Sequence, residues 1–447
     1  MREDYISVVG LGKLGACSAV CFAAKGFNVL GMDINKKYVD LINQGKATVS
    51  EPKLQDFIIL AGERLKATQN YEDLILYSDI TFLIIPTPSK PDGSFSDAYL
   101  KTALKGLGKA LKKDKKDYHL FVITSTVSPG TTERSLIPAI EKSSGRKINN
   151  GFGVAYNPEF IALGEVINGF LNPDLLLIGQ SDGLVGDQLE KIYKKTCENK
   201  PYIARMSIIS AEITKISLNA YVTMKISYAN NLANICERVL GTDIDDITKA
   251  LGADKRISPF YLKGGPAFGG PCFPRDGRAF VSFARKNGVA AKLAKATDEV
   301  NRYQLEHLTK IVLNEVKQAK DKTVSVLGLA YKPKTPVIEE AAAIKLVEEL
   351  VKNGVKVFVY DPLAMENTKA LFGDKIKYAS SVKECVAAAP VCVITTPDKE
   401  FKTFGESGFQ NREMTVIDCW RILDPAKLGK RVKYIGWGKA RKKENAA

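Results

Sequence analysis

The first two hundred residues alternate short apolar runs with longer stretches in which apolar and polar residues recur at helical spacing. Apolar runs of about four to eight residues are typical of buried strands, and the longer periodic stretches are typical of helices. The predicted strands cover residues 5–9, 27–32, 80–85, 119–125, 152–156 and 175–179. The predicted helices lie around residues 96–113, 130–143 and 183–198. Strands that alternate with helices predict a doubly wound parallel sheet.

The strand signal fades from about residue 207. Residues 210–240 have the periodicity of one long helix, and more helix follows around 243–251. A segment rich in glycine and proline, 263–274, interrupts this region before helices resume through roughly residue 318. The pattern predicts a helical block in the middle of the chain.

Strand and helix alternate again in the last third of the chain. A strand at 324–327, a helix at 340–353 and a strand at 356–360 follow one another. The apolar run at 389–397 resembles the earlier run at 78–88, since each ends in Thr-Pro. This similarity predicts a second, smaller sheet of related topology.

Together these patterns predict an α/β protein with two Rossmann-like, doubly wound parallel-sheet domains joined by a central helical block. We expect the domains to cover residues 1–206, 207–318 and 319–438, followed by a charged tail at 439–447. A chain of 447 residues is too long for one ordinary core, which agrees with this division.

The composition narrows the classes of function. Hydrophobic residues make up 45% of the chain and charged residues 26%, which are ordinary values for globular proteins. The longest apolar runs are far too short to cross a bilayer, and no charged start followed by a long apolar stretch marks a signal peptide. We therefore expect a cytoplasmic protein that does not bind membranes.

The formal net charge of +15 raises the question of nucleic-acid binding. The basic residues are spread over the whole chain, and no aromatic residues interleave with them in a nucleic-acid motif. A solvated basic surface that attracts an anionic small substrate explains the charge better than nucleic-acid binding does.

The number and spacing of the cysteines and histidines limit which side chains can perform acid–base catalysis. The eight cysteines form no CxxC pair and no Cys/His cluster with metal-site spacing, so we expect a reducing compartment and no metal site. Cys17 and Cys21 lie four apart on a predicted helix, where packing against a sheet explains them. Only two histidines occur, so acid–base catalysis is expected to fall to lysine, carboxylate and cysteine side chains.

The first candidate site follows the first predicted strand. Gly10, Gly12 and Gly15 form a GxGxxG turn, and the second strand ends at Asp33, 21 positions after Gly12. In a dinucleotide-binding unit the first glycine permits a tight turn, the second admits the pyrophosphate, and the third lets helix and strand pack closely. An acid at this distance binds the ribose hydroxyls and repels a 2′-phosphate, which favours NAD over NADP.

A second candidate is the segment 269–276, which reads GGPCFPRD. Cys272 stands in a Gly/Pro-rich loop, where no helical or strand periodicity makes it a core residue. A thiolate is a good nucleophile towards an aldehyde, and Asp276 could position a water or accept a proton. A buried cysteine without a chemical role is the alternative on this motif alone.

Three further segments carry candidate groups. Lys215 and Asn219 are four apart on the predicted long helix and share one face, where they could stabilise developing negative charge or simply face solvent. Glu159, in the run Asn-Pro-Glu-Phe after a predicted strand, is a candidate general base or a solvated turn residue. Thr126 follows another strand and could contact the cofactor or a catalytic water, or cap a helix.

In this order the segments closely resemble the UDP-glucose/GDP-mannose dehydrogenase family, from Gly10 to about Leu423. The most specific segments are the NPEF run, the lysine–asparagine helix, the GGPCFPRD loop and the run GLAYKP at 328–333. The resemblance implies an NAD-dependent oxidoreductase that oxidises the primary alcohol of a nucleotide sugar to a carboxylate, with UDP-glucose as the default substrate and UDP-glucuronate as the product. It also implies a homodimer or higher homo-oligomer paired through the long helix, and a last domain that binds the UDP part.

The resemblance further implies roles for individual residues. Cys272 attacks the intermediate aldehyde to give a thiohemiacetal, and oxidation of this adduct gives a thioester. Water directed by Glu159 and Asp276 releases the acid, while Lys215 and Asn219 stabilise the oxyanion. The cofactor-contacting set comprises Gly10, Gly12, Leu14, Gly15, Asp33, Thr87 and Thr126, the last of which also holds a water. The substrate-contacting set comprises Lys215, Asn219, Arg256, Tyr261, Lys263, Phe268, Gly269 and Lys332. The arginine of this set is implied to reach the partner subunit's site.

The chain departs from the family pattern at four positions. Leu163 stands where a second carboxylate is usual, and Arg275 stands where a lysine is usual. Glu339 replaces an arginine, and Trp420 stands in place of another arginine, with Arg421 next to it. The cysteine chemistry is untouched, but an acid near a pyrophosphate would repel it, so the sugar or the nucleotide could differ from UDP-glucose.

Three alternatives stay open. The same chemistry could act on a UDP-N-acetylhexosamine or on GDP-mannose. A two-electron hydroxyacid dehydrogenase can share the first sheet and the lysine–asparagine helix, but it does not need Cys272 and usually lacks a second sheet. A non-catalytic nucleotide-binding homologue would accommodate Glu339 and Trp420, but it has no physical need for the retained candidate catalytic groups.

Overall fold

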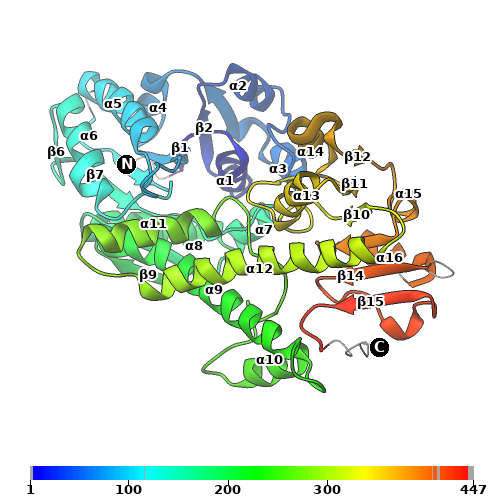
Figure 1. The fold of residues 1–447 in the computed structure, drawn as a ribbon. Coiled ribbons are helices and arrows are strands. Elements are labelled where there is room, and N and C mark those ends of the chain that lie inside the picture. Colours follow the sequence, from blue (N-terminus) through cyan, green and yellow to red (C-terminus); the bar gives the residue numbers. More distant parts are fainter. Residues whose placement is uncertain (1–3, 115, 405, 410–412, 441–447) are drawn as a thin grey trace. The chain divides into compact units, whose positions relative to one another are not determined.

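A computed structural model describes residues 4–114, 116–404, 406–409 and 413–440. Residues 441–447, which belong to the predicted charged tail, lie outside the described residues. The chain forms two compact units, Met1–Ser217 and Leu218–Ala447. Helix α9 (Ile208–Cys236) begins in the first unit and ends in the second (Figure 1). None of the helices in the described ranges has both the length and the hydrophobicity needed to cross a membrane.

The first unit is built on one large sheet. Its strands are β1 (Tyr5–Val9), β2 (Asn28–Met32), β3 (Leu65–Thr68), β4 (Ile80–Leu83), β5 (Leu120–Ile123), β6 (Lys147–Ile148), β7 (Gly151–Tyr156), β8 (Leu175–Gln180) and β9 (Tyr202–Met206). The strand order is β3-β2-β1-β4-β5-β7-β8-β9, and β6 pairs with β7. Its helices before α9 are α1 (Lys13–Ala24), α2 (Lys36–Asn43), α3 (Leu54–Ala61), α4 (Tyr71–Tyr77), α5 (Ala98–Lys113), α6 (Ile137–Ser144), α7 (Val166–Leu171) and α8 (Gly183–Thr196). The predicted alternation of strand and helix is confirmed.

Apolar side chains cover both faces of this sheet. Along β5, Leu120 belongs to the cluster that includes α1, α3, α7 and α8, whereas Phe121 belongs to the cluster that includes α4, α5 and α6. Because neighbouring residues of a strand point to opposite faces, the two clusters lie on opposite sides of the sheet. Cys17 and Cys21 of α1 are buried in the first cluster, as their spacing predicts.

The sheet departs from a purely parallel arrangement at one place. β8 pairs antiparallel with β7, whereas β8 and β9 pair in parallel. In this pair Ala155 lies opposite Gln180 and Tyr156 opposite Gly179, so the last residues of β7 are paired with the last residues of β8. β8 therefore begins beyond the carboxyl end of β7 and runs back towards it.

The carboxyl ends of the central strands form the expected binding edge of the first unit. β1 and β4 are neighbours in the sheet, but the chain continues to β2 on one side and to β5 on the other. Ligands of open α/β sheets bind in the crevice at such a reversal of strand order. The turns after β1, β4 and β5 are therefore the places to look for a cofactor site.

The second unit contains a helical part and a second parallel sheet. Its helices after α9 are α10 (Ile244–Ala253), α11 (Phe273–Lys286), α12 (Lys292–Gln318), α13 (Ala342–Lys352), α14 (Met365–Phe372), α15 (Val382–Ala387) and α16 (Lys399–Phe404). Its strands are β10 (Thr323–Leu327), β11 (Lys356–Tyr360), β12 (Lys377–Tyr378), β13 (Val391–Ile394), β14 (Met414–Asp418) and β15 (Val432–Gly436). The strand order is β12-β11-β10-β13-β14-β15, which reverses between β10 and β13. The helical middle and the second sheet confirm the predicted fold class.

The two sheets share a feature at the turn after their first strand. Gly10 and Gly328 directly follow β1 and β10, with φ values of 97° and 93°. Asp33 and Asp361 directly follow the neighbouring strands β2 and β11. Asp33 accepts two backbone amides, at 2.7 and 2.8 Å, whereas the buried Asp361 accepts four, at 2.7 to 3.1 Å. Asp33 in the first sheet therefore stays partly exposed, whereas the carboxylate of Asp361 in the second sheet is occupied by backbone amides.

Replacing Asp361 by alanine is expected to destabilise the second unit, because four amides would lose a charged acceptor at a buried position. Hydrogen bonds to charged groups contribute about 1.5–3 kcal/mol each, so the free energy of unfolding should fall by at least ~3 kcal/mol, measured by urea denaturation. Asp374→Ala, at an exposed position of the same unit, is the matched control and should change it by less than ~0.5 kcal/mol. An effect of Asp361→Ala as small as that of the control would contradict this role.

Candidate active site

The turn after β1 has the geometry of a dinucleotide cradle. A Cβ on Gly10 would lie 2.2 Å from the Ile84 carbonyl oxygen, and a Cβ on Gly15 would lie 1.8 Å from the Gly10 carbonyl oxygen. A Cβ on Gly12, by contrast, would meet nothing within 4 Å. The fold itself therefore requires the first and third glycines, whereas the second leaves room beside the N-terminus of α1 for a pyrophosphate.

Asp33 lies next to this turn and is held in place by backbone amides. Its Oδ2 accepts the Leu11 amide at 2.7 Å, and its Oδ1 accepts the Asn35 amide at 2.8 Å. The carboxylate is oriented but remains half-buried, so it can also accept ribose hydroxyls. Leu14 is half-buried and packs against the core beneath α1, where it stabilises the helix of the cradle.

Two predicted cofactor contacts meet after β4 and β5. The Thr87 hydroxyl donates to the Thr126 carbonyl oxygen at 2.6 Å, and the Thr126 side chain is half-buried. Together with the glycine turn they occupy the carboxyl edge where the strand order reverses. The open space at Gly12, the helix start and the Asp33 carboxylate fit the phosphates and the ribose of NAD.

Glu159 follows β7 and is surrounded by groups from α8 and α9. Tyr193 donates its hydroxyl to Asn157, and the same oxygen lies 3.4 Å from Glu159 Oε1. Lys215 donates its ammonium to the Glu159 carbonyl oxygen at 2.6 Å and lies 4.5 Å from the centre of the Phe160 ring. The structure therefore brings two predicted site residues together and adds a tyrosine that no sequence motif indicates.

The surroundings of Glu159 raise its pKa to near neutral pH. Burial raises its pKa to about 7, although the Lys215 ammonium and the Tyr193 hydroxyl act in the opposite direction. A carboxyl group with this pKa exchanges its proton near neutrality, which suits a general base.

Glu212 carries no signal of its own in the sequence, although it lies three residues before Lys215 on α9. Its buried carboxylate accepts the backbone amides of Gly130 and Thr132, the latter at 2.9 Å. Burial raises the pKa of Glu212, and these hydrogen bonds oppose that effect. The contact fixes the turn that follows Thr126 against the helix that carries Lys215.

In the second unit, Cys272 immediately precedes α11. It is exposed, whereas six of the eight cysteines are buried and Cys197 is half-buried. The start of a helix carries partial positive charge, which stabilises an anion such as a thiolate. Cys272 is therefore the thiol best placed to act as a nucleophile.

Asp276 lies in the first turn of α11, and its amide donates to the Cys272 carbonyl oxygen at 2.8 Å. Asn219 donates its side-chain amide to Asp276 Oδ2 at 2.7 Å, and Arg275 Nε lies 3.6 Å from Oδ1. Asp276 is 1% exposed, yet its Oδ1 accepts no hydrogen bond from the described residues. A buried acceptor with spare capacity is suited to hold a water or a substrate hydroxyl.

The loop before Cys272 passes very close to the segment that follows β10. A Cβ on Gly269 would lie 2.1 Å from the Glu340 carbonyl oxygen, and a Cβ on Gly270 would lie 2.5 Å from the Tyr331 ring. The Gly270 amide donates to the Glu339 carbonyl oxygen at 3.1 Å. These approaches explain why both positions are glycine. They also show that the loop before Cys272 and the segment that follows β10, which are separate motifs in the sequence, are neighbours in the structure.

Three carboxamides from α9 and α12 also hold this loop. Asn230 accepts the Gly265 amide at 2.8 Å, and Gln304 donates to the Gly265 carbonyl oxygen at 3.1 Å. Asn301 accepts the amide of Phe268 at 2.7 Å and donates to its carbonyl oxygen at 3.0 Å. Single carboxamides in a helical pattern give no periodic signal, so sequence reasoning misses them.

The remaining predicted substrate contacts differ in their surroundings. Phe268 and Lys332 are half-buried, whereas Tyr261 and Lys263 are exposed. Arg256 is also exposed and forms an ion pair with the nearby Asp254 at 2.6 Å. The structure of one chain thus leaves this arginine at the surface.

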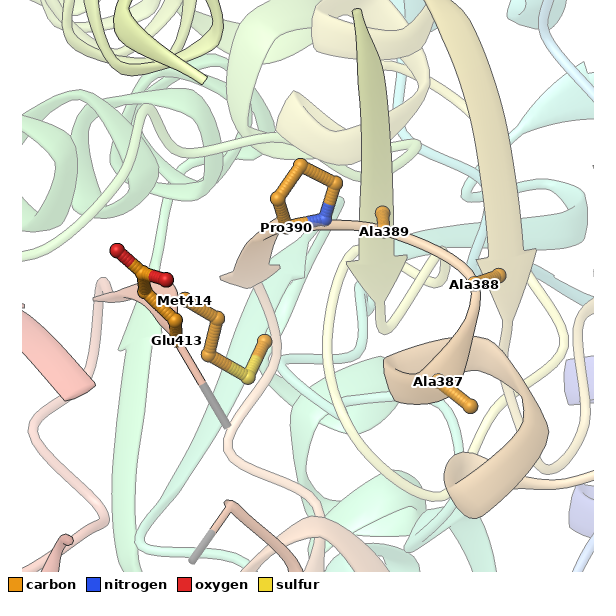
Figure 2. Close-up of a pocket in the computed structure, with 6 residues that line it drawn as sticks. All are labelled: Ala387, Ala388, Ala389, Pro390, Glu413 and Met414. Atoms are coloured by element: carbon orange, nitrogen blue, oxygen red, sulfur yellow. The ribbon is translucent and has the colours of Figure 1, made fainter. Parts of the chain in front are cut away.

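A hollow of about 310 Å³ lies at the amino ends of β13 and β14 (Figure 2). It is lined by Ala387, Ala388, Ala389, Pro390, Glu413 and Met414. Because ligands of such sheets bind at the carboxyl ends of the strands, and only one lining side chain is charged, this hollow does not resemble a nucleotide site.

Three of the four unusual positions have clear surroundings. Leu163 packs against the core of the first unit. The Glu339 side chain is exposed, so solvent screens the repulsion that its charge would exert on a phosphate. Arg421 forms an ion pair with Asp245. Its side chain therefore does not take the place of the family's arginine, whose position is occupied here by Trp420.

Comparison with known proteins gives matches over most of the chain. Residues 4–197 match the NAD binding domain of the UDP-glucose/GDP-mannose dehydrogenase family, residues 209–303 its central domain and residues 325–425 its UDP binding domain. The chain is 38% identical to UDP-glucose 6-dehydrogenase AglM of Haloferax volcanii, over 94% of this chain and 97% of that protein. It is 32% identical to GDP-mannose 6-dehydrogenase of Pseudomonas putida, over 97% of this chain and 100% of that protein. A solved structure of a UDP-glucose dehydrogenase from Pyrobaculum islandicum matches with a TM-score of 0.89 and 31% identity, and 98% of each chain is covered.

These matches confirm the predicted cofactor and the predicted class of enzyme. The NAD binding domain coincides with the glycine cradle and Asp33, so the cofactor is NAD and the protein is an NAD-dependent oxidoreductase. From its three matched domains, the chain belongs to the UDP-glucose/GDP-mannose dehydrogenase family.

Proposed function

We propose that this protein oxidises UDP-glucose to UDP-glucuronate in two NAD-dependent steps, with Cys272 as the covalent nucleophile. The observation that carries the proposal is the exposed Cys272 at the start of α11, one turn before the buried carboxylate of Asp276. Relatives named for UDP-glucose, at 38% and 31% identity, support the choice of nucleotide sugar.

The three matched domains suggest a division of labour. Residues 1–206 bind NAD, residues 207–318 carry the catalytic lysine and cysteine, and residues 319–438 bind the UDP part. Gly10, Gly12, Gly15 and Asp33 would hold the phosphates and ribose of NAD, which when bound accepts a hydride in each oxidation.

The first oxidation converts the primary alcohol of the sugar to an aldehyde. The hydroxyl loses its proton and the carbon loses a hydride, so negative charge develops on the oxygen. The Lys215 ammonium and the Asn219 amide lie one turn apart on α9 and are the groups proposed to stabilise that charge.

The second oxidation takes place on the cysteine. The Cys272 thiolate adds to the aldehyde carbon, a C–S bond forms, and the carbonyl oxygen takes up a proton to give a thiohemiacetal. Loss of a hydride and of the hydroxyl proton then converts this adduct to a thioester, with the C–S bond intact.

Hydrolysis releases the product. Water adds to the thioester carbon, Glu159 accepts its proton, and the C–S bond breaks so that the thiolate leaves. The spare acceptor of Asp276 is proposed to hold a water in the second unit. Thr126 is half-buried and is proposed to hold a water in the first unit. The sum is one alcohol, two NAD⁺ and one water converted to one carboxylate, two NADH and three protons.

GDP-mannose is the second candidate substrate, supported by the relative of that name at 32% identity over 97% of this chain. The same residues would perform the same steps on it. Only the groups around the base and the sugar would differ.

A homodimer is proposed from one face of α9. Tyr221, Tyr228 and Ile235 recur every seven residues on this helix and are 58%, 53% and 50% exposed. Large apolar side chains at heptad spacing form a stripe that pairs well with a second copy of the same helix.

The covalent mechanism predicts two NADH per molecule of UDP-glucose, measured by absorbance at the end of the reaction. Cys272→Ser should abolish steady turnover, because a hydroxyl is a far weaker nucleophile than a thiolate. Cys197→Ser, a change at a half-buried cysteine outside the proposed mechanism, is the control and should keep the stoichiometry of two. One NADH per sugar, unaffected by Cys272→Ser, would instead indicate a simple alcohol dehydrogenase.

The raised pKa of Glu159, about 7, predicts the pH dependence of hydrolysis. The carboxyl must be unprotonated to accept a proton, so kcat should rise with pH and level off above about pH 7 if hydrolysis limits the rate. Glu159→Gln should lower kcat by roughly 10²–10⁴-fold and remove this rise. A pH profile that is the same in both proteins would rule out Glu159 as the base.

The dimer proposal predicts that Tyr228→Asp converts the protein to a monomer, because a charge would be buried in an apolar contact. Light scattering after gel filtration measures the mass directly. Tyr99→Asp, which changes an equally exposed tyrosine on α5, is the matched control and should leave the dimer intact. A Tyr228→Asp protein that stays dimeric would place the interface elsewhere.

A further inference from the structure

The carboxyl edge of the second sheet is formed by three short segments. The strand order reverses between β10 and β13, so a ligand is expected beside the ends of these strands. Residues 328–332 follow β10, residues 395–396 follow β13, and residues 419–420 follow β14, the neighbour of β13. Trp420 therefore lies at the edge where this sheet is expected to bind its ligand.

The indole ring of Trp420 is held from two sides. Its Nε1 donates to the Thr395 carbonyl oxygen at 2.8 Å, which ties the ring to the end of β13. A Cβ on Gly265 would lie 3.2 Å from the ring, so the ring packs directly against the loop that leads to Cys272. The residue as a whole is half-buried, so it is not fully enclosed by the protein.

Arg421, the next residue, does not place its positive charge beside the Trp420 ring. Arg421 donates to the Trp437 carbonyl oxygen and forms an ion pair with Asp245, and its side chain is 10% exposed. Residues 420–421 therefore present an aromatic surface without a free charge. An aromatic face attracts a flat nucleobase by stacking, whereas it offers little to a phosphate.

We infer that Trp420 is a specificity-determining residue whose indole ring stacks on the base of the nucleotide sugar. The inference rests on the proposed function, because it takes a nucleotide sugar as the ligand. The ring also supports Gly265, whose amide and carbonyl are held by Asn230 and Gln304. Base binding at Trp420 would thus take place beside the loop that leads to Cys272.

The chain offers a direct optical test, because it contains only two tryptophans. Trp437 is 1% exposed and packs edge-on against the His307 ring, so its emission should not respond to a ligand. UDP alone is expected to quench the fluorescence of the wild-type protein. The same titration of Trp420→Phe, in which only Trp437 emits, should show no change although UDP still binds.

Affinity gives the second measurement. Trp420→Ala should weaken UDP binding by about tenfold or more in calorimetry, whereas Trp420→Phe keeps a ring and should stay within about threefold of wild type. The KM for the nucleotide sugar should rise with the dissociation constant, while kcat changes less. The affinity for NAD should be unchanged in both variants, which separates the effect from misfolding.

The outcomes distinguish this inference from the proposed function. UDP binding in calorimetry without quenching, or with equal affinity in Trp420→Ala, would overturn the role of Trp420 and leave the proposed function standing. Quenching by UDP-glucose but not by UDP would assign the ring to the sugar and overturn the stacking on the base. A wild-type protein that binds none of UDP, UDP-glucose and GDP-mannose would overturn the proposed function itself, and the inference with it.

Discussion

The loop that ends at Cys272 passes the segment around Glu340 so closely that no side chain fits at Gly269. This approach sets where α11 begins, and therefore where the thiol and the first helical turn lie. Asp276 then follows one turn later, beside the amide of Asn219. The proposed nucleophile is held by this close backbone packing and needs little further ordering when substrate binds. Such positioning is a large part of what an active site contributes to rate.

The two candidate acid–base groups owe their properties to different surroundings. Burial is the main influence on Glu159 and raises its pKa to about 7. Asp276 is 1% exposed, with an amide donor on one oxygen and a guanidinium near the other. Groups of the same chemical type can thus serve as a proton acceptor in one place and as a fixed anchor for water in another.

Both sheets have a glycine after their first strand and an acid after the neighbouring strand, but these residues have different partners in the two sheets. In the first, α1 starts directly after Gly12, so a helix N-terminus faces the site, and Asp33 keeps capacity for ribose hydroxyls. In the second, α13 starts only at Ala342, after an inserted segment that contacts the loop of Cys272. Asp361 is occupied by four backbone amides and holds that segment in place. The acidic position that is proposed to contact the ribose in the first sheet is a structural support in the second.

The sequence alone determined the two sheets, the helical middle, the glycine cradle with Asp33 and the loop of Cys272, because strand and helix periods and glycine turns are local properties. Only the tertiary structure decided that β8 runs antiparallel to β7, that Glu159 is partly buried, and which groups Glu212 and Asn230 contact. It also decided that Arg421 turns to Asp245 and leaves Trp420 at the sheet edge. Such partners are far apart in the sequence, and only packing brings them within hydrogen-bonding distance.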